Sequence, residues 1–271
     1  MDRLRKMVGL VLALGAVVVL LLSLSVSASA AEVVDSGTCG TNLTWVFDSE
    51  GTLTVSGNGD MAVSNYEWPW YSFRNEISTL VIQEGVTSVG GAAFQGCFCL
   101  TKVELSKSVN KIEELAFSAC EMPSITLPES IESIGDEAFY YCWHLTDIDI
   151  PSNLTNISDS AFRMCFGLKS IDVSQNNAVY SSENGVLFNK NQTEMICYPY
   201  GRNDESYTVT DTVVRIGNNA FNDDAGGKLK RLSIPNSVTS IGEYCFYNWA
   251  PEEIDYYGSK AQWPDCKRTF S

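Results

Sequence analysis

A short sequence repeat constrains the fold of this chain more than any other feature. The first residue of an apolar-x-apolar run recurs at positions 80, 103, 125, 148 and 171, a period of 22 or 23 residues. In six units, the first four of these and two later ones that begin at 207 and 232, the second apolar residue of the run is followed seven residues later by Ile or Val, and five residues after that by Phe. The six phenylalanines at this position are Phe94, Phe117, Phe139, Phe162, Phe221 and Phe246. Length changes fall only between the Phe and the next run, as expected when core positions keep their register and one loop varies.

The repeat predicts a solenoid whose core is shared between units. Alternate residues of the apolar run should point inward from a β-strand. The segment from the Ile or Val to the Phe, called the cassette here (134–139, for example), should close the other side of the core. One unit cannot bury its apolar face alone, so its neighbours must supply most of its stability. The predicted fold is mainly β, a leucine-rich-repeat solenoid with a parallel sheet, an N-terminal β-hairpin cap and an inserted β-hairpin.

Two segments outside the repeat set the predicted domain boundaries. Residues 43–47 and 53–55 alternate around a turn, which predicts a hairpin that covers the first unit. Residues 174–206 lack the cassette and read as a hairpin inserted into one unit, which could project from the solenoid edge. The expected organisation is 1–31 signal peptide, 32–76 N-terminal β cap, 77–173 leucine-rich repeats, 174–206 inserted hairpin, and 207–271 leucine-rich repeats with a C-terminal cap.

The N-terminus has the pattern of a secretory signal peptide. Arg3, Arg5 and Lys6 precede an uncharged apolar run at 8–22, and small residues follow at 28–30. An uncleaved anchor is the alternative, because the run approaches the roughly 18–20 residues that a spanning helix needs. We favour cleavage, since small residues replace the run without a stop-transfer cluster of charges. The chain is therefore expected to be secreted or held at the cell surface, with no transmembrane span after cleavage.

The charge balance excludes several partners. The formal net charge is −15, and removal of residues 1–31, which carry three basic residues and one acid, makes it −17. Nucleic acid and anionic membrane surfaces both attract basic proteins, so neither is an expected partner. We expect a monomer.

Four of the nine cysteines follow the repeat. Each lies three residues after a cassette Phe, so the four should form a column of packed thiols inside the solenoid, an arrangement we favour over a metal stack or serial disulfides. These residues are Cys97, Cys120, Cys142 and Cys165. Cys245 replaces the cassette Ala and should also lie in the core. The sequence does not determine any pairing among the others, Cys39, Cys99, Cys197 and Cys266.

No catalytic motif is present, and an enzyme is not expected. The chain has one histidine, His144, which any Ser-His-acid or Cys-His mechanism would have to use. Its neighbours Trp143 and Leu145 indicate a loop residue beside the core. Phosphate-loop, dinucleotide, HExxH and CxxC patterns are absent from the sequence. Composition does not exclude a carboxylate pair for glycoside hydrolysis, but a regular stack without a deep cleft is a poor scaffold for one.

An aromatic cluster follows the predicted N-terminal hairpin. Its members are Tyr66, Trp68, Trp70, Tyr71 and Phe73. Exposed aromatic rings can form a platform on which sugars stack, whereas buried ones would seal the cap against the first unit. We favour packing, because large aromatic side chains are mostly buried.

The outward face of the main sheet is the predicted binding surface. Its acidic members are Glu104, Asp147, Asp149, Asp172 and Asp255. Adjacent strands lie about 4.8 Å apart, so Asp149 and Asp172 should be neighbours, with Asp147 and Glu104 close by. Such like charges destabilise one another, which a bound Ca²⁺ or a basic partner would offset. The alternative, which we favour, is a solvated acidic face without a cofactor.

The units also carry a resemblance to a known family. "SITLPESIESIGDEAFYYC" and "SIPNSVTSIGEYCF" resemble the BspA-type leucine-rich repeats of exported and surface proteins of bacteria and some protists. The opening "GTCGTNLTWVFDSEGTLTVSGNGDM", the insert "ENGVLFNKNQTEMICYPYG" and the closing "IDYYGSKAQW" are similar to segments that accompany these repeats. The resemblance implies a non-catalytic exported binding or adhesion protein that presents its strand face to a protein or glycan. A structural spacer or stalk without a specific ligand is the alternative.

Overall fold

The computed structural model describes residues 31–62, 67–221, 228–247 and 251–259. Contacts divide the chain into two compact units, Met1–Glu32 and Val33–Ser271. Only two residues of the first unit are described, so the expected signal peptide lies almost entirely outside the described residues. Within the described ranges, no helix is long and apolar enough to cross a membrane. The second unit is described below.

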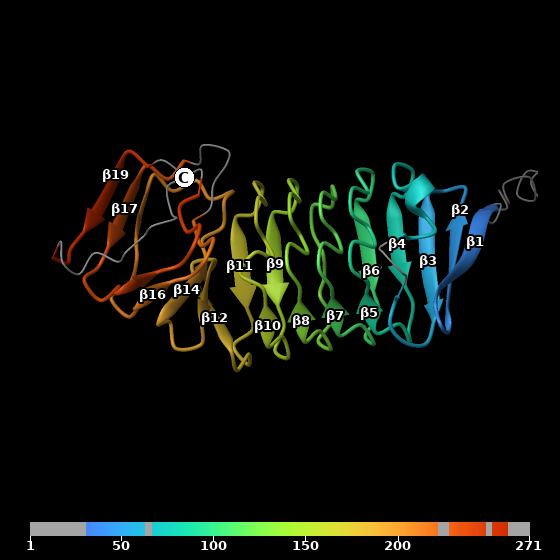
Figure 1. Ribbon diagram of the computed structural model, residues 1–271, viewed down its shortest axis with the longest axis horizontal. Coiled ribbons are helices and arrows are strands. Elements are labelled where there is room, and N and C mark those ends of the chain that lie inside the picture. Colours follow the sequence, from blue (N-terminus) through green and yellow to red (C-terminus); the bar gives the residue numbers. More distant parts are fainter. Residues whose placement is uncertain (1–30, 63–66, 222–227, 248–250, 260–271) are drawn as a thin grey trace, which may run out of the picture. The chain divides into compact units, whose positions relative to one another are not determined.

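The first sheet joins the N-terminal cap to the first repeats (Figure 1). Its strands, in spatial order, are β1 (Val33–Gly40), β2 (Leu43–Asp48), β3 (Thr52–Gly57), β4 (Thr79–Ile82) and β6 (Lys102–Leu105). The first three are antiparallel, and β3 then pairs in parallel with β4, with Leu53 opposite Leu80. β2 and β3 form the predicted hairpin, while β1 was not predicted. The cap therefore continues the register of the repeats and covers their first edge.

A second parallel sheet, which the sequence did not indicate, runs along the other side of the core. Its strands are β10 (Asn156–Ile157), β8 (Ser133–Ile134), β7 (Lys111–Ile112) and β5 (Ser88–Val89). Each contains only the first cassette residue and the residue before it, and the cassette residues lie opposite one another across the ladder. The ladder explains why this position is always Ile or Val, since a β-branched side chain packs well on a pleated surface.

The main sheet is interrupted at one predicted strand. Ile125 and Leu127 are buried as expected, but their run forms only one bridge, between Ser124 and Asp147. Pro123 and Pro128 flank the run, and proline has no N–H to donate to a ladder. The prediction of a strand at this run is therefore wrong. Pairing resumes with β9 (Asp147–Ile150) and β11 (Ser170–Val173), and later with β15 (Ser206–Thr208), β17 (Arg231–Ile234) and β19 (Glu253–Tyr256).

The cassette phenylalanines stack along the core. All six are buried, and from Trp70 of the cap through Phe94 to Phe162 successive rings are stacked with centroids 5.6–5.8 Å apart. Trp68 and Trp70 are also buried, and their indole N–H groups donate to the carbonyls of Gly91 and Ala93 at 2.9 and 2.8 Å. These two tryptophans seal the cap, whereas Tyr66 lies outside the described residues.

The four column cysteines are buried free thiols. The Sγ atoms of Cys120, Cys142 and Cys165 each donate to the carbonyl of the Phe one unit earlier, at 3.0–3.1 Å. Cys245 is buried as well. Of the cysteines whose pairing was open, Cys39 is buried, Cys99 exposed and Cys197 half-buried, and all three are free. Cys266 lies outside the described residues.

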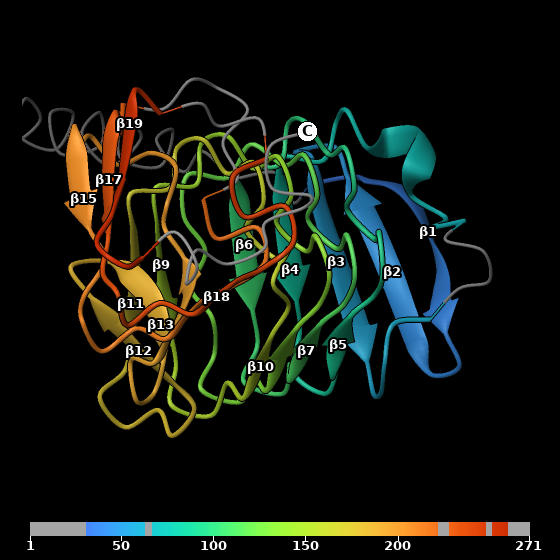
Figure 2. The same ribbon diagram turned by 60° about the vertical axis from the view of Figure 1, so that its left-hand side comes forward.

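The inserted segment is part of the stack and does not project from it. It contains β12 (Tyr180–Glu183), β13 (Val186–Asn189) and β14 (Glu194–Cys197), followed in the same sheet by β16 (Arg215–Ile216) and β18 (Ser240–Ile241). β13 and β14 form the predicted hairpin, and β12 adds a strand that was not predicted. β14 pairs in parallel with β16, so it takes the place of a cassette strand (Figure 1). In Figure 2, β12 and β13 lie beside β11, the last strand of the early repeats. The expectation of a projecting hairpin is wrong, because the apolar residues of the hairpin are buried in the two core clusters on either side of it.

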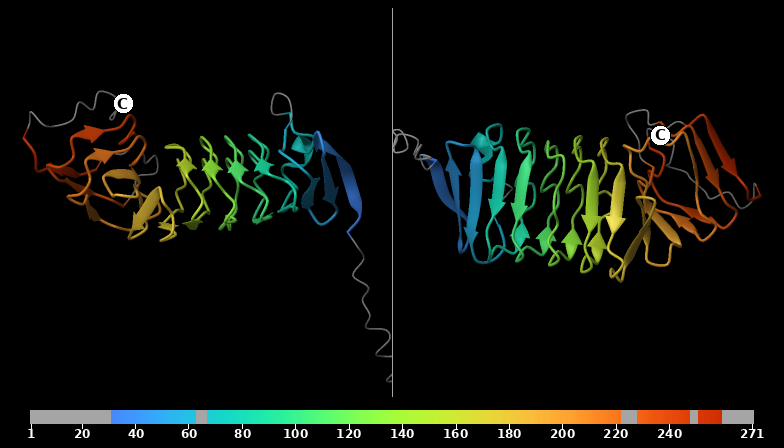
Figure 3. Two further views of the ribbon diagram at one scale, coloured as in Figure 1. Left: turned by 90° about the horizontal axis from the view of Figure 1, so that it is seen from below. Right: turned by 180° about the vertical axis from the view of Figure 1, so that it is seen from behind.

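β13 separates those two cores. Leu187 belongs to the buried cluster that runs from the cap to the fourth repeat, whereas Val186 and Phe188 belong to the cluster of the later repeats. Successive side chains of a strand point to opposite faces, so one strand can face both clusters. Strands of the early and late repeats flank this segment in the views of Figure 3.

Candidate binding surfaces

The strand face places two of its predicted carboxylates together. Asp149 and Asp172 lie opposite each other in the β9–β11 ladder, and Asp147 lies opposite Ser170. All three aspartates are exposed. The Ser170 hydroxyl donates to Asp172 Oδ2 at 2.7 Å, which partly offsets the repulsion between the carboxylates. This pair is the part of the predicted acidic site that the fold assembles.

The other two carboxylates of the predicted site lie in different sheets. Glu104 is opposite Val81 in the first sheet and forms an ion pair with Lys102, with Nζ and Oε1 2.6 Å apart. Asp255 is opposite Ser233 in the sheet of β17 and β19. Among the described residues, no group of three or more His, Cys, Asp or Glu side chains is arranged to hold a metal ion. The described residues therefore provide no group of carboxylates that would coordinate a Ca²⁺ ion.

An exposed aromatic patch lies on the loops that follow the cassettes. We define the aromatic patch as Tyr141, Trp143, Phe166 and Tyr200. Tyr141 contacts Trp143 and Phe166 edge-to-face, with centroids 4.8 and 5.8 Å apart. Phe166 makes the same kind of contact with Trp143 at 5.9 Å and with Tyr200 at 6.0 Å. Trp143 is 48% exposed and Tyr141 is 36% exposed, although the core a few residues away buries its rings completely.

The repeat itself positions the aromatic patch. Each column cysteine points into the core, so the residue immediately after it points outward on the same edge of every unit. These residues are Phe98, Glu121, Trp143 and Phe166. Tyr141, two residues after Phe139, has a left-handed backbone with φ of 63°, which helps to turn its loop. The sequence did not lead us to predict this column, because the loops vary in length, although the residue after each cysteine recurs at the repeat period.

A carboxylate–histidine pair borders the aromatic patch. His144 Nε2 lies 2.8 Å from Glu121 Oε2, and their side chains are 61% and 37% exposed. Glu121 occupies in its own unit the position that Trp143 occupies in the next. The patch therefore presents apolar ring surface beside an accessible carboxylate. Planar polar groups next to exposed rings are typical of sites that fix the orientation of a ligand.

Two arginines of the chain each contact a tyrosine ring and a carboxylate. The Arg163 guanidinium lies 5.6 Å from the Tyr140 ring centre and 6.0 Å from that of Tyr247, and its Nη1 donates to Glu137 at 3.0 Å. Arg202 repeats the arrangement with Tyr198 and Asp204. In the second case the carboxylate also accepts the Tyr198 hydroxyl at 2.8 Å, and these donors lower the pKa of Asp204 despite its desolvation.

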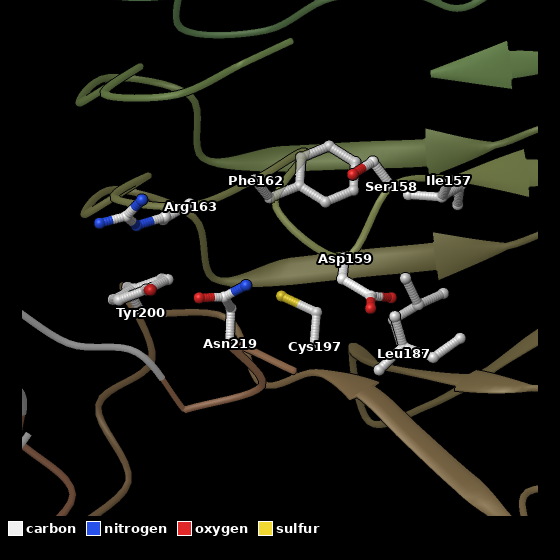
Figure 4. Close-up of a pocket in the computed structure, with 10 residues that line it drawn as sticks. Ile157, Ser158, Asp159, Phe162, Arg163, Leu187, Cys197, Tyr200 and Asn219 are labelled. Atoms are coloured by element: carbon white, nitrogen blue, oxygen red, sulfur yellow. The ribbon is translucent and has the colours of Figure 1, made fainter. Parts of the chain in front are cut away.

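A groove of about 400 Å³ marks the junction between the early and late repeats. It is lined by Glu114, Asp136, Glu137, Ser158, Asp159, Ser160, Asn218 and Asn219. Asn218 Nδ2 donates to Asp159 Oδ2 at 2.8 Å and the Ser158 hydroxyl donates to Asp136, so two of its carboxylates already have donors. A cavity of about 10 Å³ adjoins it, with Arg163 and Tyr200 at one end (Figure 4). That volume suits one water molecule at most.

The comparisons with known proteins agree with this architecture. A stack of parallel strands over a buried Phe column is the architecture of a leucine-rich-repeat protein. The chain belongs to the BspA type leucine-rich-repeat family, whose pattern matches six copies over residues 69–193 and 194–264. No curated protein is significantly similar to it.

The solved structures that are similar to the chain include the following two. A leucine-rich-repeat protein from Eubacterium ventriosum is 27% identical, with a TM-score of 0.67, and the match covers 83% of this chain and 73% of that one. The pneumococcal vaccine antigen PcpA is 21% identical, with a TM-score of 0.58, over 83% of this chain and 70% of that one. The second likeness shows the fold alone. Members of the BspA-type family are typically exported or held at surfaces.

Proposed function

We propose that this chain is a non-catalytic exported binding or adhesion protein that engages a protein or glycan ligand at a surface. The observation that carries the proposal is the aromatic patch, where Trp143 and Tyr141 stay exposed and contact one another while the cassette rings of the same units are buried. Exposed Trp and Tyr side chains that become buried in a complex supply much of the binding energy at interfaces. A solenoid also offers an extended surface built from the same position of successive units.

Two surfaces could carry the ligand. The aromatic patch offers rings and one carboxylate, whereas the strand face offers the Asp149–Asp172 pair with Asp147 beside it. Glu104 and Asp255 would belong to separate contacts along an extended ligand, because neither shares the β9–β11 ladder. The patch is the stronger candidate, since burying rings is favourable whereas desolvating carboxylates costs free energy unless a cation accompanies them.

A comparison of two double variants tests the proposal. Residues 32–271 would be screened against arrays of purified proteins and glycans, and the best ligand titrated by calorimetry. Tyr141→Ala/Trp143→Ala should weaken its binding at least about tenfold, the effect expected at an interface hot spot. Asp149→Asn/Asp172→Asn is the matched control and should bind as the parent does.

If the aspartate variant lost binding and the aromatic variant kept it, the ligand would bind at the strand face. A parent protein that binds nothing on either array would contradict the proposal and favour the structural spacer or stalk. Equal binding by both variants and the parent would contradict a role for either surface.

A further inference from the structure

We infer that the aromatic patch, with Glu121, is a receptor for a basic, arginine-containing segment of a partner protein. The inference rests on the proposed binding function and deepens it by choosing a protein ligand over a neutral glycan. Its starting point is that the patch resembles, in chemistry, the places where this fold already holds a guanidinium group.

Those internal examples define what such a site needs. Arg163 lies over the Tyr140 ring with Nη1 on Glu137, and Arg202 lies over the Tyr198 ring with Nε 2.7 Å from Asp204. In both, one ring face and one carboxylate hold the same cation. A guanidinium stacks on aromatic faces and is weakly hydrated, so this combination binds it better than it binds a neutral group.

The aromatic patch has the same two components on its surface. Trp143 is the aromatic side chain that attracts a cation most strongly, and nearly half of its surface is exposed. Glu121 stands one unit away in the same column and keeps more than a third of its side chain exposed. Its described partner is the His144 imidazole, which an incoming guanidinium could displace or join.

Charge complementarity favours a basic occupant. The net charge of the chain is −15, and Arg163 and Arg202, which lie within three residues of patch members in the sequence, are already paired with Glu137 and Asp204. An acidic surface of this kind attracts a basic segment over long range and repels an acidic one. A neutral glycan could stack on the rings, but the negative charge of the protein would not attract it. The observations therefore favour a peptide with arginine over a sugar.

Matched peptides test the inference directly. The probes are a fluorescent peptide of alternating arginine and glycine, its citrulline counterpart, which has the same shape without charge, and a set of neutral oligosaccharides. We expect residues 32–271 to bind the arginine peptide at least about tenfold more tightly than the citrulline peptide. Trp143→Ala and Glu121→Gln should each weaken the arginine peptide about fivefold to tenfold. His144→Ala, which removes the internal partner of Glu121, should strengthen it severalfold.

Phe98→Ala is the matched control, because Phe98 occupies the same position as Trp143 two units earlier and is 56% exposed without belonging to the patch. It should leave the affinity unchanged, which separates the patch from general attraction to an acidic protein. Circular dichroism would verify that each variant is folded. Equal affinity for the arginine and citrulline peptides, or equal weakening by Phe98→Ala and Trp143→Ala, would overturn the inference. Patch-dependent binding of an oligosaccharide instead would overturn it while retaining the proposed binding function.

Discussion

Single residues in the cassettes adopt a backbone that costs free energy. The residue two positions before the cassette Phe has a positive φ in five of the six units: Ala92, Leu115, Glu137, Asn219 and Tyr244, with φ between 50° and 57°. The residue two positions after Phe repeats this in four units, and Ala119 is one example with φ of 57°. Residues with a Cβ avoid this region, so the tight turns of the solenoid are built with little help from glycine.

The positive φ of Ala119 predicts that an Ala→Gly substitution affects stability differently at Ala119 and at nearby Ala116. Ala119→Gly should leave stability unchanged or raise it by up to about 1 kcal/mol, because relief of the left-handed backbone outweighs the added freedom of the unfolded chain. Ala116→Gly, at a buried position where the chain gains no such relief, should lower stability by about 1–2 kcal/mol through the lost methyl group and the same added freedom. Urea unfolding measures both. Similar losses in the two variants would show that the positive φ carries no strain.

At the scale of elements, the insert shows what the sequence pattern could and could not predict. The cassettes were predictable because Ile, Ala and Phe recur at fixed intervals dictated by the shared core. The strands β5, β7, β8 and β10 span only two residues each, too short to show an alternating pattern. The run at 125–127 alternates correctly, yet its flanking prolines prevent a ladder. The position of β13 between two cores depends on partners far along the chain, which no local pattern encodes.

Because β13 faces both cores, two adjacent side chains should control the stability of different parts of the molecule. Leu187→Ala should increase amide hydrogen exchange in residues 133–173, and Phe188→Ala should increase it in residues 207–221 and 228–246, since each removes packing from one cluster. Each truncation should cost about 2–5 kcal/mol in its own cluster. Hydrogen exchange followed by mass spectrometry locates the changes. Identical exchange maps for the two variants would mean that the clusters unfold as one unit.

On the scale of the whole molecule, the column of thiols links stability to pH. Burial raises the pKa of Cys97 and Cys142 to about 12 and that of Cys120 and Cys165 well above the ordinary value of 9.0. In the unfolded chain these thiols lose their protons above about pH 9, whereas in the folded chain they keep them. The unfolded state then binds fewer protons, so stability is complete below pH 9 and falls as the pH rises toward 12.

The expected fall is about 1.4 kcal/mol per pH unit for each buried thiol. Urea unfolding between pH 8 and 10.5 measures the slope for the parent and for two variants. Cys142→Ala should have a shallower slope because it removes one such thiol, while Cys99→Ala should match the parent because Cys99 is exposed. The slope is the informative quantity, since Cys142→Ala also loses packing at every pH. A parent whose stability does not change over this range would contradict the prediction.

The separation between a fixed cassette and a variable loop has a consequence for how such a protein can change. The rings of the aromatic patch lie on loops whose other residues, such as Cys142 and Cys165, are buried, so only the outward positions are free to vary, much as antibody loops vary on a constant framework. Mutation can therefore alter Trp143 or Phe166 without altering the packing of the cassette phenylalanines. Duplication of one unit would copy its outward residues along with its core. A lineage of such chains could acquire new ligands by exchanging loops while inheriting an unchanged scaffold.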